Sequence, residues 1–314
     1  MLKSEILHEL EKNRDCPISG QALAEKYQVS RNAVWKAVNS LKEEGYMILS
    51  ARNRGYVLAR DCDRLSGEGI RAYLPPELEE MPLYVFQELD STNNEARRML
   101  ASGFRGRACV VSEYQSAGRG RGTHTFYSPA GTGLYLTLLT AAQELPTPPS
   151  LITIAAAVAV CRAVEAFCGL QLQVKWVNDL YLDGKKAGGI LSEAVTDLES
   201  GHIEEAAVGI GLNVTTEEFP PDIRDRAISL GSNAGNRNRL AAEIIRQFYQ
   251  LHLSDHTSYM EEYRSQSLVP GKSVWYNGEK VQAEGLDELG GLIICRENGS
   301  REILRSGSVL LEDE

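Results

Sequence analysis

The chain has 314 residues, which is long for one domain and sufficient for two or three. With 43% hydrophobic and 24% charged residues, it has the composition of a globular protein and not of a disordered chain. A formal net charge of −10 argues against nucleic-acid binding by the chain as a whole. Residues 1–60, however, carry ten Lys and Arg against seven Asp and Glu, a net of +3, which leaves −13 for residues 61–314. Only the N-terminal part is therefore expected to approach DNA.

The longest apolar stretch, around Ile152 to Cys161, is too short to span a bilayer and ends at Arg162. We therefore expect a buried helix and no membrane partner. The first residues lead into an amphipathic helix without a secretory apolar segment, which predicts a cytoplasmic protein. The six cysteines form no CxxC pair and are expected to be reduced thiols. His252 and His256 lie four residues apart, but no third ligand is nearby, so we expect surface histidines and no metal site.

In chain order, the first predicted helix has apolar residues at helical spacing, namely Leu2, Ile6, Leu7 and Leu10. Ser19 is expected to cap a second helix that runs to about Tyr27, and Ser30 a third that runs to Leu41. The short turn between them has helix-turn-helix spacing. In such motifs, polar residues at the start of the later helix meet base edges and phosphates. The residues predicted here to contact DNA are Ser19, Ser30, Arg31, Asn32 and Lys36.

Two short apolar runs, 46–49 and 55–58, predict a hairpin whose tip carries Arg52 and Arg54. Two arginines at a hairpin tip suit backbone phosphates, so both are added to the predicted DNA contacts. Residues 1–62 thus predict a winged helix-turn-helix DNA-binding domain. The alternative is a helical protein-interaction module with a solvated basic tip. A short linker follows, and then a small helix that Ser66 caps and Pro75 stops.

The central part of the chain begins with an apolar run at 83–86 that predicts a strand. It leads to Asp90-Ser91-Thr92-Asn93 and to a helix over about 94–100. A second predicted strand at 108–111 precedes the segment Ser116–Gly122, in which three glycines alternate with two arginines. Glycine lets the backbone approach a ligand closely, and arginine offers a planar fork of donors to carboxylate or phosphate oxygens. By itself, this Gly/Arg segment could also be a solvated turn or an RNA-binding element.

Five blocks occur in a fixed order along the centre of the chain. They are Asp90-Ser91-Thr92-Asn93, Gln115 with the Gly/Arg segment, Lys175-Trp176-Val177-Asn178-Asp179, Lys186-Ala187-Gly188-Gly189-Ile190-Leu191 and Gly209-Ile210-Gly211-Leu212-Asn213. In this order they resemble the catalytic domain of biotin–protein ligases. Together with the N-terminal segment, essentially the whole chain resembles the bifunctional biotin–protein ligases that also repress the biotin operon, the BirA type.

The resemblance implies a two-step reaction. Biotin and ATP form biotinyl-5′-AMP and pyrophosphate, and a lysine of a biotin carrier protein of the acetyl-CoA carboxylase type then attacks the adenylate carbonyl. Because the first step brings a carboxylate against a triphosphate, cations must neutralise like charges. Lys186, Arg119 and Arg121 are the predicted catalytic residues. Mg²⁺ would bridge phosphate oxygens, with Asp179 near the metal.

By the same resemblance, small polar side chains at 91–93 and Gln115 would hold the ureido ring of biotin. Trp176 would help to line the pocket, and Asn213 would read the nucleotide. The predicted adenylate site comprises Ser91, Thr92, Asn93, Gln115, Gly118, Arg119, Gly120, Arg121, Trp176, Asp179, Lys186, Gly189 and Asn213. Simpler alternatives remain: Ser91 could only cap a helix, Lys186 could be an ordinary surface lysine, and Asn178-Asp179 a turn.

The chain departs from the family pattern in three places. His124 stands where a further arginine is usual, Phe126 replaces a tryptophan, and Val177 replaces a proline. The central cations are all present, so catalysis is expected to survive. Retention of the reactive adenylate depends on how the loop closes and is the property these replacements most affect.

Long apolar helices are expected over about 151–167 and 240–263, with no chemistry assigned to them. After Pro270, short strands separated by Asn277-Gly278, Gly290-Gly291 and Asn298-Gly299 predict hairpins. This block resembles the small SH3-like β-barrel at the end of such ligases, although an extra β-layer of the central domain is the alternative. The predicted fold is α+β: a winged helix-turn-helix at 1–62, a mixed α/β ligase domain of the biotin/lipoate type at 63–269 and the SH3-like domain at 270–314.

The favoured function is therefore an ATP-dependent biotin–protein ligase that also binds operator DNA as a repressor. A metabolite-sensing repressor with little ligase activity is one alternative, which the intact cations argue against. A lipoate–protein ligase, whose catalytic fold is related, is another, but the winged helix and the C-terminal block favour biotin. A glycine-rich loop loses entropy when a ligand orders it, so bound adenylate lowers the entropy cost of any surface built on that loop. If this surface is a dimer interface, the adenylate is expected to promote a homodimer that reaches two half-sites.

Overall fold

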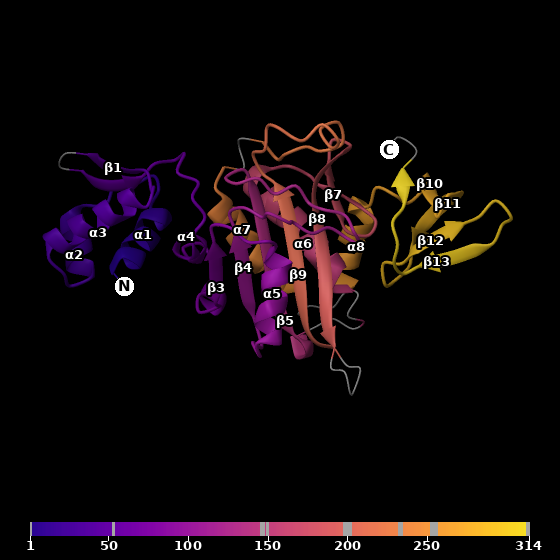
Figure 1. Ribbon diagram of the computed structural model, residues 1–314, viewed down its shortest axis with the longest axis horizontal. Coiled ribbons are helices and arrows are strands. Elements are labelled where there is room, and N and C mark those ends of the chain that lie inside the picture. The colour runs from indigo at the N-terminus through magenta and orange to yellow at the C-terminus, as the bar shows by residue number, and fades with distance from the viewer. Residues whose placement is uncertain are drawn as a thin grey trace. The chain divides into compact units, whose positions relative to one another are not determined.

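The computed structural model (Figure 1) describes residues 2–51, 54–144, 148, 151–196, 203–231, 235–251 and 257–311. It divides into two compact units. The first comprises residues 1–80 and 235–243, and the second residues 81–234 and 244–314. Helix α7 (Arg237–Leu251) has its first turns in the first unit and the remainder in the second.

The first unit contains the predicted helix-turn-helix. Its elements are α1 (Leu2–Lys12), α2 (Gly20–Lys26), α3 (Arg31–Glu43), β1 (Ile48–Ala51), β2 (Gly55–Leu58), α4 (Gly67–Arg71) and the 3-10 turn η1 (Pro76–Leu78). The Ser19 Oγ accepts a hydrogen bond from the Ala22 backbone N–H at 3.0 Å, and the Ser30 Oγ from the Ala33 N–H at 3.2 Å. Both predicted N-caps are therefore present, and each satisfies a backbone donor that the first helical turn leaves without a partner.

The core of this unit is formed by the apolar faces of its helices. Val34 and Val38 of α3 pack with Ile6 of α1 and Leu23 of α2. The antiparallel β1–β2 hairpin is held to the start of α2 by backbone hydrogen bonds between Ile18 and Tyr56. Gly55 has φ of +102°, and a Cβ there would lie 2.1 Å from the Ile18 carbonyl oxygen. Only glycine fits at that point of the hairpin.

The second unit is built on a seven-stranded sheet of order β3-β4-β5-β9-β8-β7-β6. Its strands are β3 (Leu83–Phe86), β4 (Ala108–Ser112), β5 (Gly133–Ala141), β6 (Gln173–Lys175), β7 (Asp179–Leu182), β8 (Lys185–Thr196) and β9 (Ile203–Asn213). The β3–β4 pair is parallel and the other pairs are antiparallel. Buried residues occupy all five positions of β4 and eight of nine in β5, as expected for central strands covered on both faces.

Helices α5 (Thr92–Ala101) and α6 (Leu151–Cys168) pack against this sheet, and a short 3-10 turn η2 (Ala142–Glu144) follows β5. Among the described residues, α6 is the helix that is long and apolar enough to cross a membrane, but 67% of it is buried inside the protein. That is the behaviour of a core helix, and it confirms the buried helix predicted over 151–167.

Within the range predicted as a single helix, 240–263, the structure describes α7 and α8 (Thr257–Gln266). His252 and His256 fall between them and lie outside the described residues, as does Arg52 of the predicted wing.

The C-terminal part is a five-stranded antiparallel sheet of order β13-β12-β11-β10-β14. Its strands are β10 (Ser273–Tyr276), β11 (Glu279–Leu286), β12 (Leu292–Cys295), β13 (Arg301–Leu304) and β14 (Leu310–Leu311). The predicted Asn277-Gly278 turn is present, with φ of 51° and 81° at its two residues. In the described strands, β13 and β14 stand at opposite ends of the order, so the sheet is open there and the predicted closed barrel is not observed.

Candidate active site

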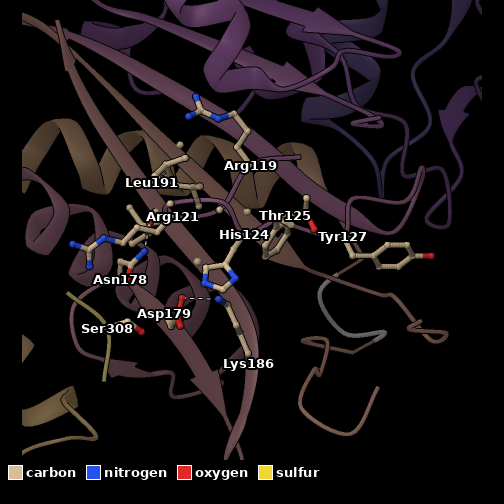
Figure 2. A pocket seen from close by; sticks show the side chains of 18 of the residues that line it. Arg119, Arg121, His124, Thr125, Tyr127, Asn178, Asp179, Lys186, Leu191 and Ser308 are labelled. Atoms are coloured by element: carbon tan, nitrogen blue, oxygen red, sulfur yellow. Dashed lines mark hydrogen bonds and ion pairs between the residues drawn. The ribbon is translucent and has the colours of Figure 1, made fainter. Parts of the chain in front are cut away.

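A cavity of about 920 Å³ opens in the second unit (Figure 2). It lies where the Gly/Arg segment, the start of α5, strands β7 to β9 and residues 306–310 meet. Most of the predicted adenylate site lines it, although these residues come from blocks up to 122 positions apart in sequence, from Ser91 to Asn213. The predicted residues in the lining are Ser91, Thr92, Asn93, Gln115, Arg119, Gly120, Arg121, Asp179, Lys186, Gly189 and Asn213.

One end of the cavity, which we call the neutral end, is built mainly from buried polar side chains without charge, although Asn93 Nδ2 also donates to the Glu193 carboxylate at 2.9 Å. The Gln115 Oε1 accepts hydrogen bonds from the Thr92 backbone N–H at 2.8 Å and from the Thr92 hydroxyl at 3.2 Å. The Thr137 hydroxyl bridges Thr92 Oγ1 at 2.9 Å and Asn93 Oδ1 at 2.8 Å. Thr137 is fully buried, and Thr92 and Asn93 are each 4% exposed. These mutual bonds fix the side chains in one arrangement before any ligand binds.

At the start of α5, the Asp90 side chain accepts hydrogen bonds, whereas the Ser91 hydroxyl makes no capping bond. The Asp90 carboxylate accepts from the Ser91 backbone N–H and from the Asn94 side chain, both at 2.8 Å, and forms an ion pair with Arg98. Chiefly because of Arg98, the pKa of Asp90 lies well below its usual range. The Ser91 hydroxyl makes no capping hydrogen bond, although Ser91 is only 1% exposed. Its hydroxyl is thus available to the cavity.

The loop Gly118–Phe126 turns back on itself. The Phe126 N–H donates to the Gly118 carbonyl at 2.8 Å, and the Gly120 N–H donates to the His124 carbonyl at 2.8 Å. A Cβ on Gly118 would lie 2.4 Å from the Phe126 carbonyl oxygen. Gly118 is therefore needed for the loop to close, and it lies outside the cavity lining.

The three predicted catalytic residues each have an acceptor partner; Lys186 and Arg121 form what we call the cationic end, and Arg119 lies beside the start of α5, where it also donates to Asn94. Arg119 Nη1 contacts both carboxylate oxygens of Glu193, at 2.9 and 3.1 Å. Lys186 Nζ lies 2.6 Å from Asp179 Oδ1, and Arg121 Nη1 donates to the Gly307 carbonyl. An incoming anion can replace these acceptors without leaving the cations unpaired.

Lys186 owes its position to an irregularity in the sheet. The β7–β8 register shifts so that Leu180 pairs with Gly188 but Tyr181 with Lys186, which makes Ala187 the extra residue of a bulge. On its other side, the Lys186 backbone exchanges hydrogen bonds with Arg226 and Ile228 at 2.8 and 3.0 Å. The backbone of Lys186 is therefore held in place from two sides, and its side chain lines the cavity.

Trp176 is not where the resemblance predicted it. It does not line the cavity, and its ring is 3% exposed in a core with Val269, Val274 and Leu292. The Trp176 Nε1–H donates to the Gly290 carbonyl at 2.9 Å. Its role is to anchor the C-terminal sheet against the start of β7, so its effect on the site is indirect.

Several lining residues were not predicted from sequence. Ser306, Gly307, Ser308 and Leu310 come from the C-terminal part, to which no chemistry had been assigned. Further unpredicted lining residues are Lys175, Asn178 and Arg226. No local pattern identifies them, because they reach the cavity only through the tertiary fold. Among the described residues, no group of three or more His, Cys, Asp or Glu side chains could hold a metal ion.

In the first unit, the predicted DNA-contacting side chains lie on one short stretch and at the hairpin. Arg31, Asn32 and Lys36 are exposed at the start of α3, and Arg54 is exposed after β1. The hydroxyls of Ser19 and Ser30 are used as caps, as described above. Trp35, in the same stretch of α3, is 54% exposed, which is unusual for a residue of that size.

Comparison with known proteins gives both units a class. Residues 3–57 match the HTH domain family, and residues 85–213 match the Biotin/lipoate A/B protein ligase family. The second unit is thus a ligase domain of the biotin/lipoate type and the first contains a helix-turn-helix domain.

Whole-chain relatives narrow this class. The chain is 31% identical over 305 residues to the bifunctional ligase/repressor BirA of Bacillus subtilis and 30% identical to that of Bacillus spizizenii, covering 91% of both chains in each comparison. A biotin protein ligase of Aquifex aeolicus, solved in complex with biotin and ATP, is similar with a TM-score of 0.62 and 27% identity, over 74% of this chain and 98% of that one. The chain belongs to the bifunctional ligase/repressor BirA family.

Proposed function

We propose that this protein is an ATP-dependent biotin–protein ligase that also represses transcription. Biotin carboxylate attacks the α-phosphorus of ATP, which forms biotinyl-5′-AMP and releases pyrophosphate. The ε-amine of a carrier lysine then attacks the acyl carbon, which forms an amide and releases AMP. The single observation that carries the proposal is one cavity with two chemically different ends, a neutral end and a cationic end.

The neutral end suits the ureido ring of biotin. That ring is uncharged and offers both N–H donors and a carbonyl acceptor. Thr92, Asn93 and Gln115 supply hydroxyl and amide groups already fixed by Thr137. Ser91 adds a buried hydroxyl that makes no helix-capping bond. A pre-formed set of neutral partners binds a neutral ligand without the cost of desolvating a charge.

The cationic end suits the junction of carboxylate and phosphate. Lys186 brings a compact ammonium and Arg121 a planar fork suited to the negative charge that gathers in the transition state, and Arg119 brings a second fork from beside the start of α5. As ligand oxygens arrive, they replace Asp179, Glu193 and the Gly307 carbonyl as acceptors. The exchange keeps each cation partnered throughout.

We propose that Mg²⁺ accompanies ATP and is held mainly by phosphate oxygens. Asp179 is the carboxylate in the described lining, and it is already bonded to Lys186. A single carboxylate plus substrate phosphates fits the ordinary coordination habits of Mg²⁺. The ion would neutralise charge on the leaving pyrophosphate.

We assign DNA binding to residues 1–62 and catalysis to residues 63–269. Residues 270–314 would form a small SH3-like domain that supplies Gly307 to the site. We place the protein in the cytoplasm, where ATP and carboxylase carriers are present. The six cysteines are all unpaired thiols, consistent with a reducing compartment.

For repression, we propose that biotinyl-5′-AMP promotes a homodimer that presents two winged helices to an operator with two half-sites. The carrier protein, by consuming the adenylate, releases the DNA. Sedimentation with and without biotin and ATP, alongside operator binding, tests this step. Equal dimerisation and equal DNA affinity in both conditions would contradict regulation by the adenylate.

The ligase is tested by incubating the full chain with ATP, a biotin carrier domain and radiolabelled biotin or lipoate. We expect label from biotin on one carrier lysine and none from lipoate. Transfer of lipoate would make this a lipoate ligase. Tight biotin binding without transfer would make it a metabolite-sensing repressor.

A further inference from the structure

Trp35 is a large apolar side chain that helix α3 presents to solvent. It is 54% exposed, whereas Trp176 is 3% exposed and donates from its indole to the Gly290 carbonyl. In the part of the chain that the structure describes, the Trp35 indole makes no hydrogen bond and no ring contact. An indole is rigid and mostly apolar, and tryptophan is highly buried on average. An exposed one without partners is therefore a candidate contact for another molecule.

The face of α3 that carries Trp35 is polar and basic. Arg31 and Asn32 lie one helical turn before Trp35 and Lys36 directly follows it, and all three are exposed. The stretch 31–42 contains no Asp or Glu. The opposite face of the helix is the one that packs into the core, through Val34, Val38 and Leu41. Trp35 is thus an apolar group within a cationic surface and is not part of an apolar patch.

The two cations beside Trp35 differ from others in the first unit. Among the described residues, neither Arg31 nor Lys36 has a carboxylate partner. Other cations of this unit form ion pairs, namely Lys3 with Glu44, Lys26 with Glu9 and Arg60 with Asp15. Unpaired cations on both sides of an apolar ring suit an anionic partner that also offers an apolar group. Duplex DNA has both, because phosphates flank a major groove that contains the methyl groups of thymine.

The position of Trp35 in α3 suits a contact to a base. In helix-turn-helix proteins, the first residues of the later helix reach base edges in the major groove. Trp35 is the fifth residue of α3, which begins at Arg31, so it lies within the first two turns. Indole has one N–H donor and no acceptor, so it cannot form the paired hydrogen bonds by which Arg, Asn or Gln read a base. The apolar feature of base edges in this groove is the thymine 5-methyl group.

We propose that the Trp35 ring packs against the 5-methyl group of a thymine in the major groove, and that this base pair is therefore part of the sequence the protein recognises. The inference rests on the proposed repressor function and deepens it by naming a base that α3 reads. Contacts of Arg31 and Lys36 to phosphates fix the position of the helix, whereas the contact of Trp35 distinguishes one base pair from another.

The first test removes the methyl group from the DNA. The full chain, with biotin and ATP, selects duplexes from a random pool, and each thymine of a selected duplex is then replaced in turn by deoxyuridine. Deoxyuridine pairs with adenine as thymine does and lacks only the 5-methyl group. We expect affinity to fall about fourfold at a thymine of each half-site, as for loss of one buried methyl-sized group. Fluorescence anisotropy of the labelled duplex measures this.

The second test removes the ring from the protein. Trp35→Ala should bind the thymine and the deoxyuridine duplexes equally, because both changes remove the same contact. Trp35→Phe keeps an apolar ring and should keep part of the difference between the two duplexes. Trp275→Ala is the matched control, since Trp275 is 44% exposed but lies in the second unit, and it should behave as the unaltered chain. Pyrophosphate release should be the same in all four proteins.

Two results would overturn the proposal while leaving repression intact. One is the absence of any thymine whose methyl group contributes to affinity, and the other is an equal deoxyuridine effect in Trp35→Ala and the unaltered chain. The proposal also fails if Trp35→Ala weakens binding to every sequence alike and lowers the salt dependence, which would indicate a phosphate contact. If the full chain selects no duplex over the starting pool, the proposed repressor function fails, and the assignment of Trp35 fails with it.

Discussion

The two ends of the cavity differ in how their polar groups are satisfied. At the neutral end, Thr92, Asn93, Gln115 and Thr137 are buried and bond to one another. The Lys186 side chain at the cationic end is 38% exposed and the Arg119 side chain 32% exposed, and each is paired with a carboxylate. A rigid end suits recognition of one neutral group, whereas partners that can be exchanged suit a site where charge appears and leaves. The comparison predicts that substitutions at the two ends will change different kinetic constants.

The largest effect is expected at the cationic end. Lys186→Ala should slow adenylate formation at least a hundredfold, since removing a group that stabilises transition-state charge costs about 3 kcal/mol or more. Pyrophosphate release measures this. Lys185→Ala is the matched control, because Lys185 is exposed and lies next along the same strand. Normal pyrophosphate release by a folded Lys186→Ala protein would remove Lys186 from the mechanism.

Thr137→Val tests the neutral end. It keeps the side-chain shape but removes the hydroxyl that donates to Asn93 and bonds to Thr92, leaving buried polar atoms without partners. We expect biotin affinity to fall about tenfold or more, with a loss of about 1–3 kcal/mol. ATP affinity should be nearly unchanged. Calorimetric titration with each ligand distinguishes the two, and an equal loss for both would indicate general disruption of the domain.

Arg121→Gly should release the adenylate about tenfold faster, because a charge-assisted contact to its phosphate is lost. The escaped adenylate should then acylate lysines of bystander proteins. This is measured by adding albumin and labelled biotin to the reaction. Unlabelled albumin, with adenylate still being formed, would show that Arg121 does not control retention here.

The smallest effect is expected in the first unit. Lys36→Ala should weaken operator binding uniformly across sequences and reduce the slope of log affinity against log salt by about 1, as for loss of one phosphate contact. Lys12→Ala at the end of α1 is the control. An unchanged slope for Lys36→Ala would mean that this side chain does not contact phosphate.

What the sequence predicted correctly was mostly local. Ser19 and Ser30 cap helices by accepting from backbone donors three residues away, so a short segment of sequence is enough to predict their roles. Arg119, Arg121 and Lys186 were predicted from the order of five short blocks, and the structure brings all three into one cavity lining. Local spacing of this kind does not depend on how distant parts of the chain meet.

What it missed depends on contacts across more than a hundred residues. Trp176 is buried by strands beyond position 269 and bonds to Gly290, which no pattern around Trp176 reveals. The Arg121–Gly307 bond joins positions 186 residues apart. The open order of the C-terminal strands depends on a shorter-range pairing, between β10 and β14, which the turn signals alone could not determine.

The central claim is that the neutral end binds biotin and the cationic end performs the activation. The most direct measurement is steady-state adenylate formation from labelled ATP by the unaltered chain, Lys186→Ala and Thr137→Val, with kcat and the KM for biotin determined separately. We predict that Lys186→Ala lowers kcat with little change in the KM for biotin, and that Thr137→Val raises this KM while keeping most of kcat. The reverse pattern, or the same pattern in both variants, would contradict the division of the cavity into these two ends.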